Sequence, residues 1–139
     1  MAPKKPIEKA AFPRVVESAI DKNSEPEALY AALDLGTNSC RMLIAQPNGA
    51  QFHVIDSFAK SVQLGSGLEK TGRLSRESIN RTIQSLQLFK QKIDKNYVKY
   101  ARLIATEACR RAKNSKEFIS KVFQQTGLKL NIINTEEEA

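Results

Sequence analysis

The sequence lacks the features that mark membrane, secreted and metal-binding proteins. No apolar run approaches the roughly 18 residues that a transmembrane helix needs. The first residues mix charge with proline and contain no continuous apolar segment, which argues against a secretory signal. The two cysteines, Cys40 and Cys109, do not have metal-ligand spacing, and we expect both to be buried free thiols. These absences favour a globular protein of the cytoplasm.

Histidine and aromatic residues are also scarce. The single histidine, His53, has no cysteine or histidine partner in a metal-binding pattern, so we expect it to have a structural or surface role. Aromatic residues make up only 6% of the chain, and no known nucleic-acid-binding motif is present. This composition argues against nucleic acid as the main partner.

Positive charge, in contrast, is abundant and unevenly distributed. The net charge is +7. Residues 1–28 carry five basic and five acidic side chains, so the whole excess belongs to the rest of the chain. Between residues 29 and 135 there are 17 basic and 7 acidic side chains. A surface of this kind attracts polyanions, either nucleic acids or phosphorylated small molecules.

The chain divides into an extension and one domain. Residues 1–28 contain four prolines among mixed charges and are expected to be disordered or weakly ordered. From residue 29 onward the apolar pattern predicts ordered elements. They are a strand, turn and strand over 29–45, a third strand over 51–60, a loop over 62–73, a helix over 76–94, a strand over 100–106, a helix that ends at Gly127, and a last strand over 128–133.

Two side chains at helix starts support these boundaries. Ser75 has the residue type of an N-cap for the first helix. Asn114 and Glu117 have the spacing of a capping box for the second. The order of three strands, helix, strand, helix and strand predicts an α/β fold with a mixed sheet flanked by helices, whose first three strands are antiparallel.

The turn between the first two strands has the composition of a phosphate-binding loop. Gly36 has no side chain to block a ligand, and Thr37, Asn38 and Ser39 supply hydroxyl, amide and backbone N–H groups. Asp34 offers a carboxylate where a metal ion could bind. The same residue types also form ordinary hairpin turns, so the composition alone leaves both interpretations open.

Chain-distant segments are expected to meet beside this turn. Ligands of mixed α/β sheets usually bind at the carboxyl ends of the strands. The turn at Asp34 follows the first strand, the segment 106–111 follows the fourth, and the glutamates at 136–138 follow the last. Their expected convergence favours a binding site over a chance turn.

Four stretches of the chain together resemble one family. They are ALDLGTNSCRMLI at 32–44, VQLGSGL and TGRLS within 62–75, ATEACRRAKN at 105–114, and IINTEEEA at 132–139. In this order they resemble the N-terminal domain of the exopolyphosphatase and guanosine pentaphosphate phosphohydrolase family. That family is part of the actin-like, sugar kinase and Hsp70 ATPase superfamily. The resemblance implies a ribonuclease H-like (actin-like ATPase) domain over residues 29–139.

The resemblance also implies roles for individual residues. Glu138 would be the catalytic glutamate and Arg110 would face the phosphate chain, with Asp34 holding a magnesium ion through water. Where the family usually has Ser-Gly before its paired glutamates, this chain has Asn134 and Thr135, which leaves Glu137 as an alternative base. The implied phosphate-binding residues are Gly36, Thr37, Asn38, Ser39 and Thr106.

The family's second phosphate loop, Asp-x-Gly-Gly-Gly-Ser, does not occur in this sequence. We therefore expect the first domain of a longer, magnesium-dependent phosphohydrolase that acts on inorganic polyphosphate or guanosine pentaphosphate and forms a homodimer at full length. The isolated domain would be inactive, because a cleft needs two walls. The alternative is an actin-like module that binds a nucleotide or polyphosphate without hydrolysing it.

Overall fold

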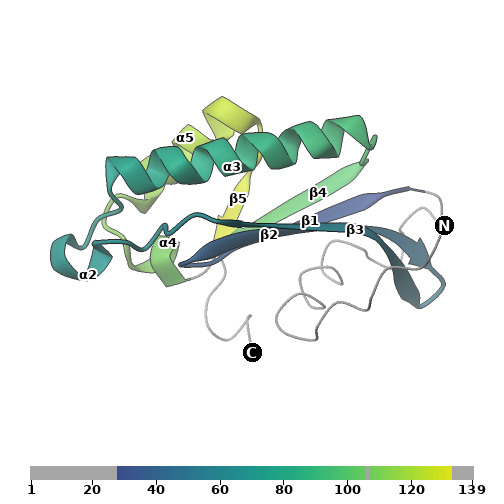
Figure 1. Cartoon of the computed structure of the whole chain (residues 1–139), viewed down its shortest axis with the longest axis horizontal. Helices are drawn as coiled ribbons and strands as arrows, with labels where there is room; N and C mark the ends of the chain where they lie inside the picture. Colours follow the sequence, from purple (N-terminus) through teal and green to yellow (C-terminus); the bar gives the residue numbers. More distant parts are fainter. Residues whose placement is uncertain (1–27, 106, 133–139) are drawn as a thin grey trace.

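A five-stranded mixed sheet forms the centre of the structure, a computed structural model that describes residues 28–105 and 107–132 (Figure 1). Its strand order is β3-β2-β1-β4-β5. The first three strands pair antiparallel, whereas β4 pairs parallel with β1 and β5 pairs parallel with β4. The strands are β1 (Tyr30–Leu35), β2 (Ser39–Asn48), β3 (Gln51–Ser61), β4 (Tyr100–Ala105) and β5 (Leu130–Ile132). The predicted mixed α/β sheet with three antiparallel strands first is confirmed.

Two long helices cover one face of this sheet. They are α3 (Arg76–Lys95) and α5 (Ser115–Thr126), and Figure 1 shows both on the same side. The predicted N-cap of α3 is confirmed, because Ser75 Oγ accepts a hydrogen bond of 3.0 Å from the Ser78 N–H. Phe89 of α3 and Phe118 of α5 are at most 1% exposed. Burial of these rings against the strands holds the helices to the sheet.

The strands of the sheet have two chemically different faces. Leu33, Leu35 and Met42 belong to the core cluster that the helices complete. Because successive side chains of a strand point to opposite faces, Asp34 lies on the face away from α3 and α5. The register places Asp34 directly opposite Arg41 of β2, which therefore shares that face. The packed core and the candidate carboxylate are thus on opposite sides of one strand.

The remaining side-chain expectations are met within the described residues. Cys40 and Cys109 are buried free thiols, and burial raises the pKa of each to about 12, which keeps both protonated and unreactive. His53 is exposed on β3. No helix in the described part of the chain combines the length and the apolar character that crossing a membrane requires.

The expected loop over residues 62–73 is corrected, because it contains a short helix, α2 (Leu68–Thr71). Leu68 is 4% exposed and anchors this turn in the core. A second short helix, α4 (Glu107–Arg111), follows β4 and was not predicted. Neither helix is long enough to give an apolar repeat that could be seen in the sequence.

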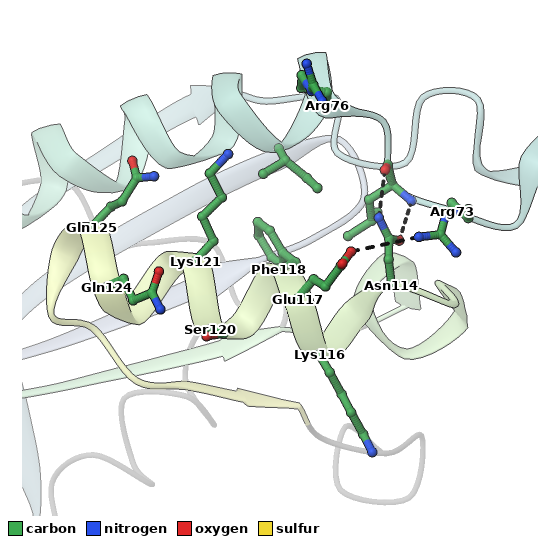
Figure 2. A pocket seen from close by; sticks show the side chains of 12 residues that line it. Arg73, Arg76, Asn114, Lys116, Glu117, Phe118, Ser120, Lys121, Gln124 and Gln125 are labelled. Carbon is green, nitrogen blue, oxygen red and sulfur yellow. Dashed lines mark hydrogen bonds and ion pairs between the residues drawn. The ribbon is translucent and has the colours of Figure 1, made fainter.

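The predicted capping box at Asn114 is wrong. The Asn114 side chain is buried and makes two hydrogen bonds to the backbone of Leu74, accepting from its N–H at 2.8 Å and donating to its C=O at 3.0 Å (Figure 2). Glu117 instead forms an exposed ion pair with Arg73 at 3.8 Å. Asn114 therefore joins the start of α5 to the segment before α3.

The segment between β3 and α2 is fastened to the turn that follows β1. The carbonyl of Asn38 accepts hydrogen bonds from the N–H groups of Val62 and Gln63 at 2.9 and 3.0 Å. On the other side, Arg81 of α3 donates to the carbonyls of the same two residues at 2.6 and 3.1 Å. Gln63 has a φ of 49°, a left-handed conformation that costs energy for a residue with a side chain. The four hydrogen bonds hold it in place.

Replacing Asn114 tests the junction between the two helices. We expect Asn114→Ala to lower the free energy of unfolding by about 2–3 kcal/mol, because the buried N–H and C=O of Leu74 lose their partners. Asn80 is a matched control, since it is exposed and its side chain accepts a hydrogen bond of 3.2 Å from Lys121 on the surface. Asn80→Ala should change stability by less than about 0.5 kcal/mol. Equal losses in urea denaturation would contradict the role of Asn114.

Replacing Arg81 tests the fastening of residues 62 and 63. Lysine cannot reproduce the fork that bonds two carbonyls. We therefore expect Arg81→Lys to reduce hydrogen-exchange protection at the amides of Val62 and Gln63 by about tenfold, with no change at Ile83 in the same helix. Arg76→Gln, an exposed change at the start of α3, is the control. Unchanged protection in Arg81→Lys would show that the loop does not depend on this side chain.

Candidate functional site

Three strands end at one edge of the sheet. In the parallel register, Leu35, the last residue of β1, lies opposite Ala105, the last residue of β4. Ala105 in turn lies opposite Ile132, the last residue of β5. The chain therefore leaves β1, β4 and β5 at the same edge, as the sequence predicts. This edge carries the turn from residue 36 to 39 and helix α4.

The turn after β1 is tight and closes on itself. The N–H of Gly36 donates to the carbonyl of Ser39 at 3.0 Å, so this N–H is already occupied. Within the described residues, the backbone N–H groups of Thr37 and Asn38 make no hydrogen bond. Asn38 and Ser39 are exposed. Two free N–H groups and two hydroxyls are the donors that this turn offers to an anion.

The fold itself does not require glycine at position 36. Among the described residues, a Cβ atom there would meet only the carbonyl oxygen of Ser39, at 3.5 Å, which is an ordinary contact, and the φ of Gly36 is not in the left-handed region. An alanine would therefore fit the unliganded turn. The remaining physical reason for glycine is the close approach of something from outside, which favours a binding loop over a simple hairpin turn.

Asp34 is the candidate metal ligand at this edge. Its side chain is only 13% exposed and lies 3.5 Å from a guanidinium nitrogen of Arg41. Burial raises the pKa of Asp34 above its ordinary value, and the charge of Arg41 partly offsets that rise. The carboxyl is held in place beside the turn, where a cation or a phosphate-bound cation would favour its charged form.

The residues at this edge fit a magnesium ion only if phosphate oxygens of a ligand and water molecules complete its coordination. No group of three or more histidine, cysteine or acidic side chains that could hold a metal ion occurs in the described part of the chain. Mg²⁺ in phosphate sites usually keeps several waters and takes one or two carboxylates together with phosphate oxygens. A single, largely buried carboxylate beside a phosphate-type turn fits that arrangement, with Asp34 acting through water.

The other predicted site residues divide into two groups. Arg110 is half-buried in the last turn of α4, the helix that follows β4, and so belongs to the same edge as the turn. Thr106, Glu137 and Glu138 lie outside the described residues. The structure therefore brings together the elements that carry Asp34, the turn and Arg110.

A hollow of about 470 Å³ beside the turn was not predicted. It is lined by Thr37 of the turn, by residues 65–70 and by Arg111 of α4. The only sequence signal for it was the glycine-rich composition of the segment after β3. Of its two basic residues, Arg111 lies within the stretch 105–114 that resembles the family but was given no role there, and Lys70 lies between the quoted motifs.

A second hollow, of about 850 Å³, lies between α3 and α5 (Figure 2). Four basic side chains line it, Arg73, Arg76, Lys116 and Lys121, and two of them make structural contacts. Arg73 pairs with Glu117, and Lys121 donates to Asn80 across the two helices at 3.2 Å. The side chain of Lys116 extends away from the groove in Figure 2. No residue of the turn after β1 lines this groove.

The chain is similar to members of one protein family. The model of the Ppx/GppA phosphatase family matches residues 43–139. The crystal structure of the Aquifex aeolicus member of that family is 36% identical, with a TM-score of 0.76 over 79% of this chain and 36% of its own. An exopolyphosphatase-like protein is 27% identical, with a TM-score of 0.77 over 81% of this chain and 34% of its own.

A third structure supports the fold alone. An exopolyphosphatase from Cytophaga hutchinsonii is 22% identical, with a TM-score of 0.74 over 78% of this chain and 35% of its own. This chain thus spans about a third of the length of the solved relatives that it matches. The strand order and these likenesses confirm the expected ribonuclease H-like (actin-like ATPase) fold. Because the family model covers more than half of the chain, the protein belongs to the Ppx/GppA phosphatase family.

Proposed function

We propose that this chain is the first domain of a longer phosphohydrolase that releases the terminal phosphate from inorganic polyphosphate or guanosine pentaphosphate. The observation that carries this proposal is the parallel pairing of β1 with β4. It ends both strands in register at Leu35 and Ala105, so the turn at 36–39 and the helix carrying Arg110 leave the same edge. Membership of a phosphatase family supports the reaction class.

The reaction needs a positioned water and neutralised charge. The oxygen of a water molecule attacks the terminal phosphorus, and the bond from that phosphorus to the bridging oxygen breaks as the new bond forms. In this proposal the carboxylate of Glu138 accepts the proton of the water, with Glu137 as the alternative base. The guanidinium of Arg110 binds two phosphate oxygens at once and stabilises their growing charge.

The turn after β1 would hold the terminal phosphate. The N–H groups of Thr37 and Asn38 and the hydroxyls of Thr37 and Ser39 donate to its oxygens, and Thr106 adds a further hydroxyl. Gly36 lets the phosphate come close to the backbone because glycine has no side chain, while the N–H of Gly36 stays bonded to the carbonyl of Ser39. Donors that are fixed before the substrate arrives need no reorganisation during the reaction.

Asp34 would hold a magnesium ion through water. The ion supplies charge neutralisation for the phosphate oxygens. The part played by the protein is to keep the Asp34 carboxylate in place against Arg41, beside the turn.

The cytoplasm is the proposed compartment and a homodimer the proposed assembly of the longer protein, in which a following domain supplies the second wall of the cleft. The isolated chain is expected to turn over little substrate.

Replacing Gly36 tests phosphate binding separately from folding. Gly36→Ala should leave the fold intact and stabilise it by about 0.5 kcal/mol, because alanine has less freedom in the unfolded chain. In the longer protein the added methyl group should lower the rate of phosphate release by about a hundredfold, because it displaces the terminal phosphate. Urea denaturation and a phosphate-release assay check the two parts.

Gly49 in the β2–β3 hairpin is the control, because its replacement should affect stability and not activity. Its φ is +64°, and no atom of the described residues lies within 4 Å of an added Cβ. Gly49→Ala should cost about 1 kcal/mol of stability from the left-handed backbone and leave phosphate release unchanged. If Gly36→Ala keeps full activity, the turn does not hold the phosphate that is cleaved.

Glu138 is tested in the same longer protein. Glu138→Gln should lower kcat about a thousandfold with little change in stability, because the amide cannot accept the proton of the water. Glu137→Gln decides between the two bases, and Glu136→Gln is the matched control. Full activity of Glu138→Gln together with loss in Glu137→Gln would move the base to residue 137. Full activity in both would remove the acidic cluster from the mechanism.

A further inference from the structure

All three tyrosines of the chain lie at the end of the sheet opposite the candidate site. Tyr30 and Tyr100 begin β1 and β4, pair in the parallel register and stack with 4.9 Å between their ring centroids. Tyr97 lies in the short connection between α3 and β4. Figure 1 shows that α3 runs from the end of the sheet that carries α2 and α4 to the opposite end, where β1 and β4 begin. The chain has few aromatic residues, yet its tyrosines are gathered in one place.

Tyr97 occupies a backbone position that glycine usually fills. Its N–H donates to the carbonyl of Asp94 at 3.2 Å, and the N–H of the next residue, Val98, donates to the carbonyl of Ile93 at 3.0 Å. These two bonds form the Schellman ending of a helix, in which the residue at this position is left-handed and is most often glycine. The φ of Tyr97 is 55°, whereas α5 ends at Gly127 with a φ of 76°. A bulky residue in this conformation is strained.

Packing does not offset this strain, because the side chain of Tyr97 is 90% exposed. In the described part of the chain its hydroxyl forms no hydrogen bond and its ring forms no aromatic or cation–π contact. A strained residue that the fold does not need is the kind of outlier from which a functional role is inferred. The ring is therefore available to a partner from outside the chain.

The surface around this ring is strongly basic. Between residues 90 and 102 there are five basic side chains and one acidic side chain, Asp94, which already pairs with a lysine of α3 at 2.7 Å. Lys95 is exposed and, within the described residues, forms no ion pair. The exposed Lys99 places its Nζ 5.5 Å from the centroid of the Tyr100 ring. We define the tyrosine patch as Lys95, Tyr97, Lys99 and Tyr100.

We propose that the tyrosine patch binds single-stranded nucleic acid. A base stacks on the free ring of Tyr97, and the ammonium groups of Lys95 and Lys99 bind phosphates on either side of it. Proteins that bind single strands without reading their sequence combine these two features, basic side chains along the strand and aromatic rings on which bases stack. This binding is separate from the proposed hydrolysis, because the patch and the turn at 36–39 lie at opposite ends of β1.

The composition of the patch favours a single strand over other anionic partners. The faces of the bases in a duplex are stacked on one another, whereas unpaired bases can be splayed out onto an aromatic side chain. A single free ring among lysines offers little apolar area, and the apolar core of a protein interface or the apolar face that inserts into a lipid surface needs more. A base that stacks on one ring therefore matches what the patch presents.

Fluorescence anisotropy with the 139-residue chain tests the stacking. The probe is a labelled uridine strand of about 12 nucleotides, comparable to the roughly 4–16 that one OB fold covers. An abasic strand of the same length carries the same charge without bases. Tyr97→Ala should weaken binding of the uridine strand about tenfold and leave that of the abasic strand unchanged. Tyr97→Phe keeps the ring and should bind like the unchanged chain. Phe123→Ala removes a ring of α5 that is 57% exposed and is the matched control, with no expected effect.

Two further variants separate charge and folding from stacking. Lys95→Gln should weaken binding of both strands about three- to fivefold and lower the slope of log affinity against log salt by about 0.7. Tyr97→Gly should raise the midpoint of urea denaturation, because glycine relieves the strain, and should lose as much affinity for the uridine strand as Tyr97→Ala. A variant that is more stable and binds more weakly excludes unfolding as the cause of the loss.

The outcomes decide between nucleic acid and a general basic surface. The proposal is overturned if neither strand binds, if Tyr97→Ala behaves like Phe123→Ala, or if the unchanged chain binds the abasic strand as tightly as the uridine strand. A deoxythymidine strand of the same length assigns the source, because tighter binding of the uridine strand supports RNA, and equal or tighter binding of the deoxythymidine strand supports single strands of either kind. Vesicles that contain an anionic lipid are the last arm. Binding to them that depends on Tyr97, without binding to either strand, would replace nucleic acid with a lipid surface.

Discussion

The parallel pairing of β1 with β4 is the constraint on which the rest of the candidate site depends. β1 has an antiparallel neighbour on one side and a parallel neighbour on the other, so it belongs at once to a local hairpin and to a long-range crossover. The hairpin alone would make residues 36–39 an ordinary turn. The crossover through α3 places Arg110 at the same edge, and only then does the turn have a chemical neighbour.

The segment from residue 62 to 74 joins several parts of the structure through hydrogen bonds made by its backbone. Asn38 accepts from it near its start, Arg81 donates to it from α3, and Asn114 bonds to its last residue. These contacts connect the turn, the helix layer and the start of α5. The same segment also contributes Val62, Leu64, Leu68 and Leu74 to the hydrophobic core, so hydrogen bonds and side-chain packing together fix its position.

Sequence patterns predicted the long elements well because those elements are amphipathic over many residues. β3 alternates in its burial and α3 buries residues at three- and four-residue spacing, whereas β1 and β4 were predicted from short apolar runs. The predicted bounds of these elements are correct within a few residues. The short helices α2 and α4 have no such period. Asn114 had the spacing of a local cap, but its partner is Leu74, forty residues earlier, and only the tertiary structure reveals that bond. The hollow at Lys70 and Arg111 was missed for the same reason, whereas the roles of Thr106 and Glu138 stay predictions.

The two faces of β1 are under different constraints, packing on one face and charge on the other. Leu33 and Leu35 answer to packing, because each is almost completely buried against the helix layer. Asp34, between them, is on the other face and contacts Arg41. Residues of the core and a residue of the candidate site therefore alternate along one strand. Sequences that share this architecture can repack the helix side by compensating substitutions while the charged side keeps its spacing, and they can change the charged side without losing the core that supports it.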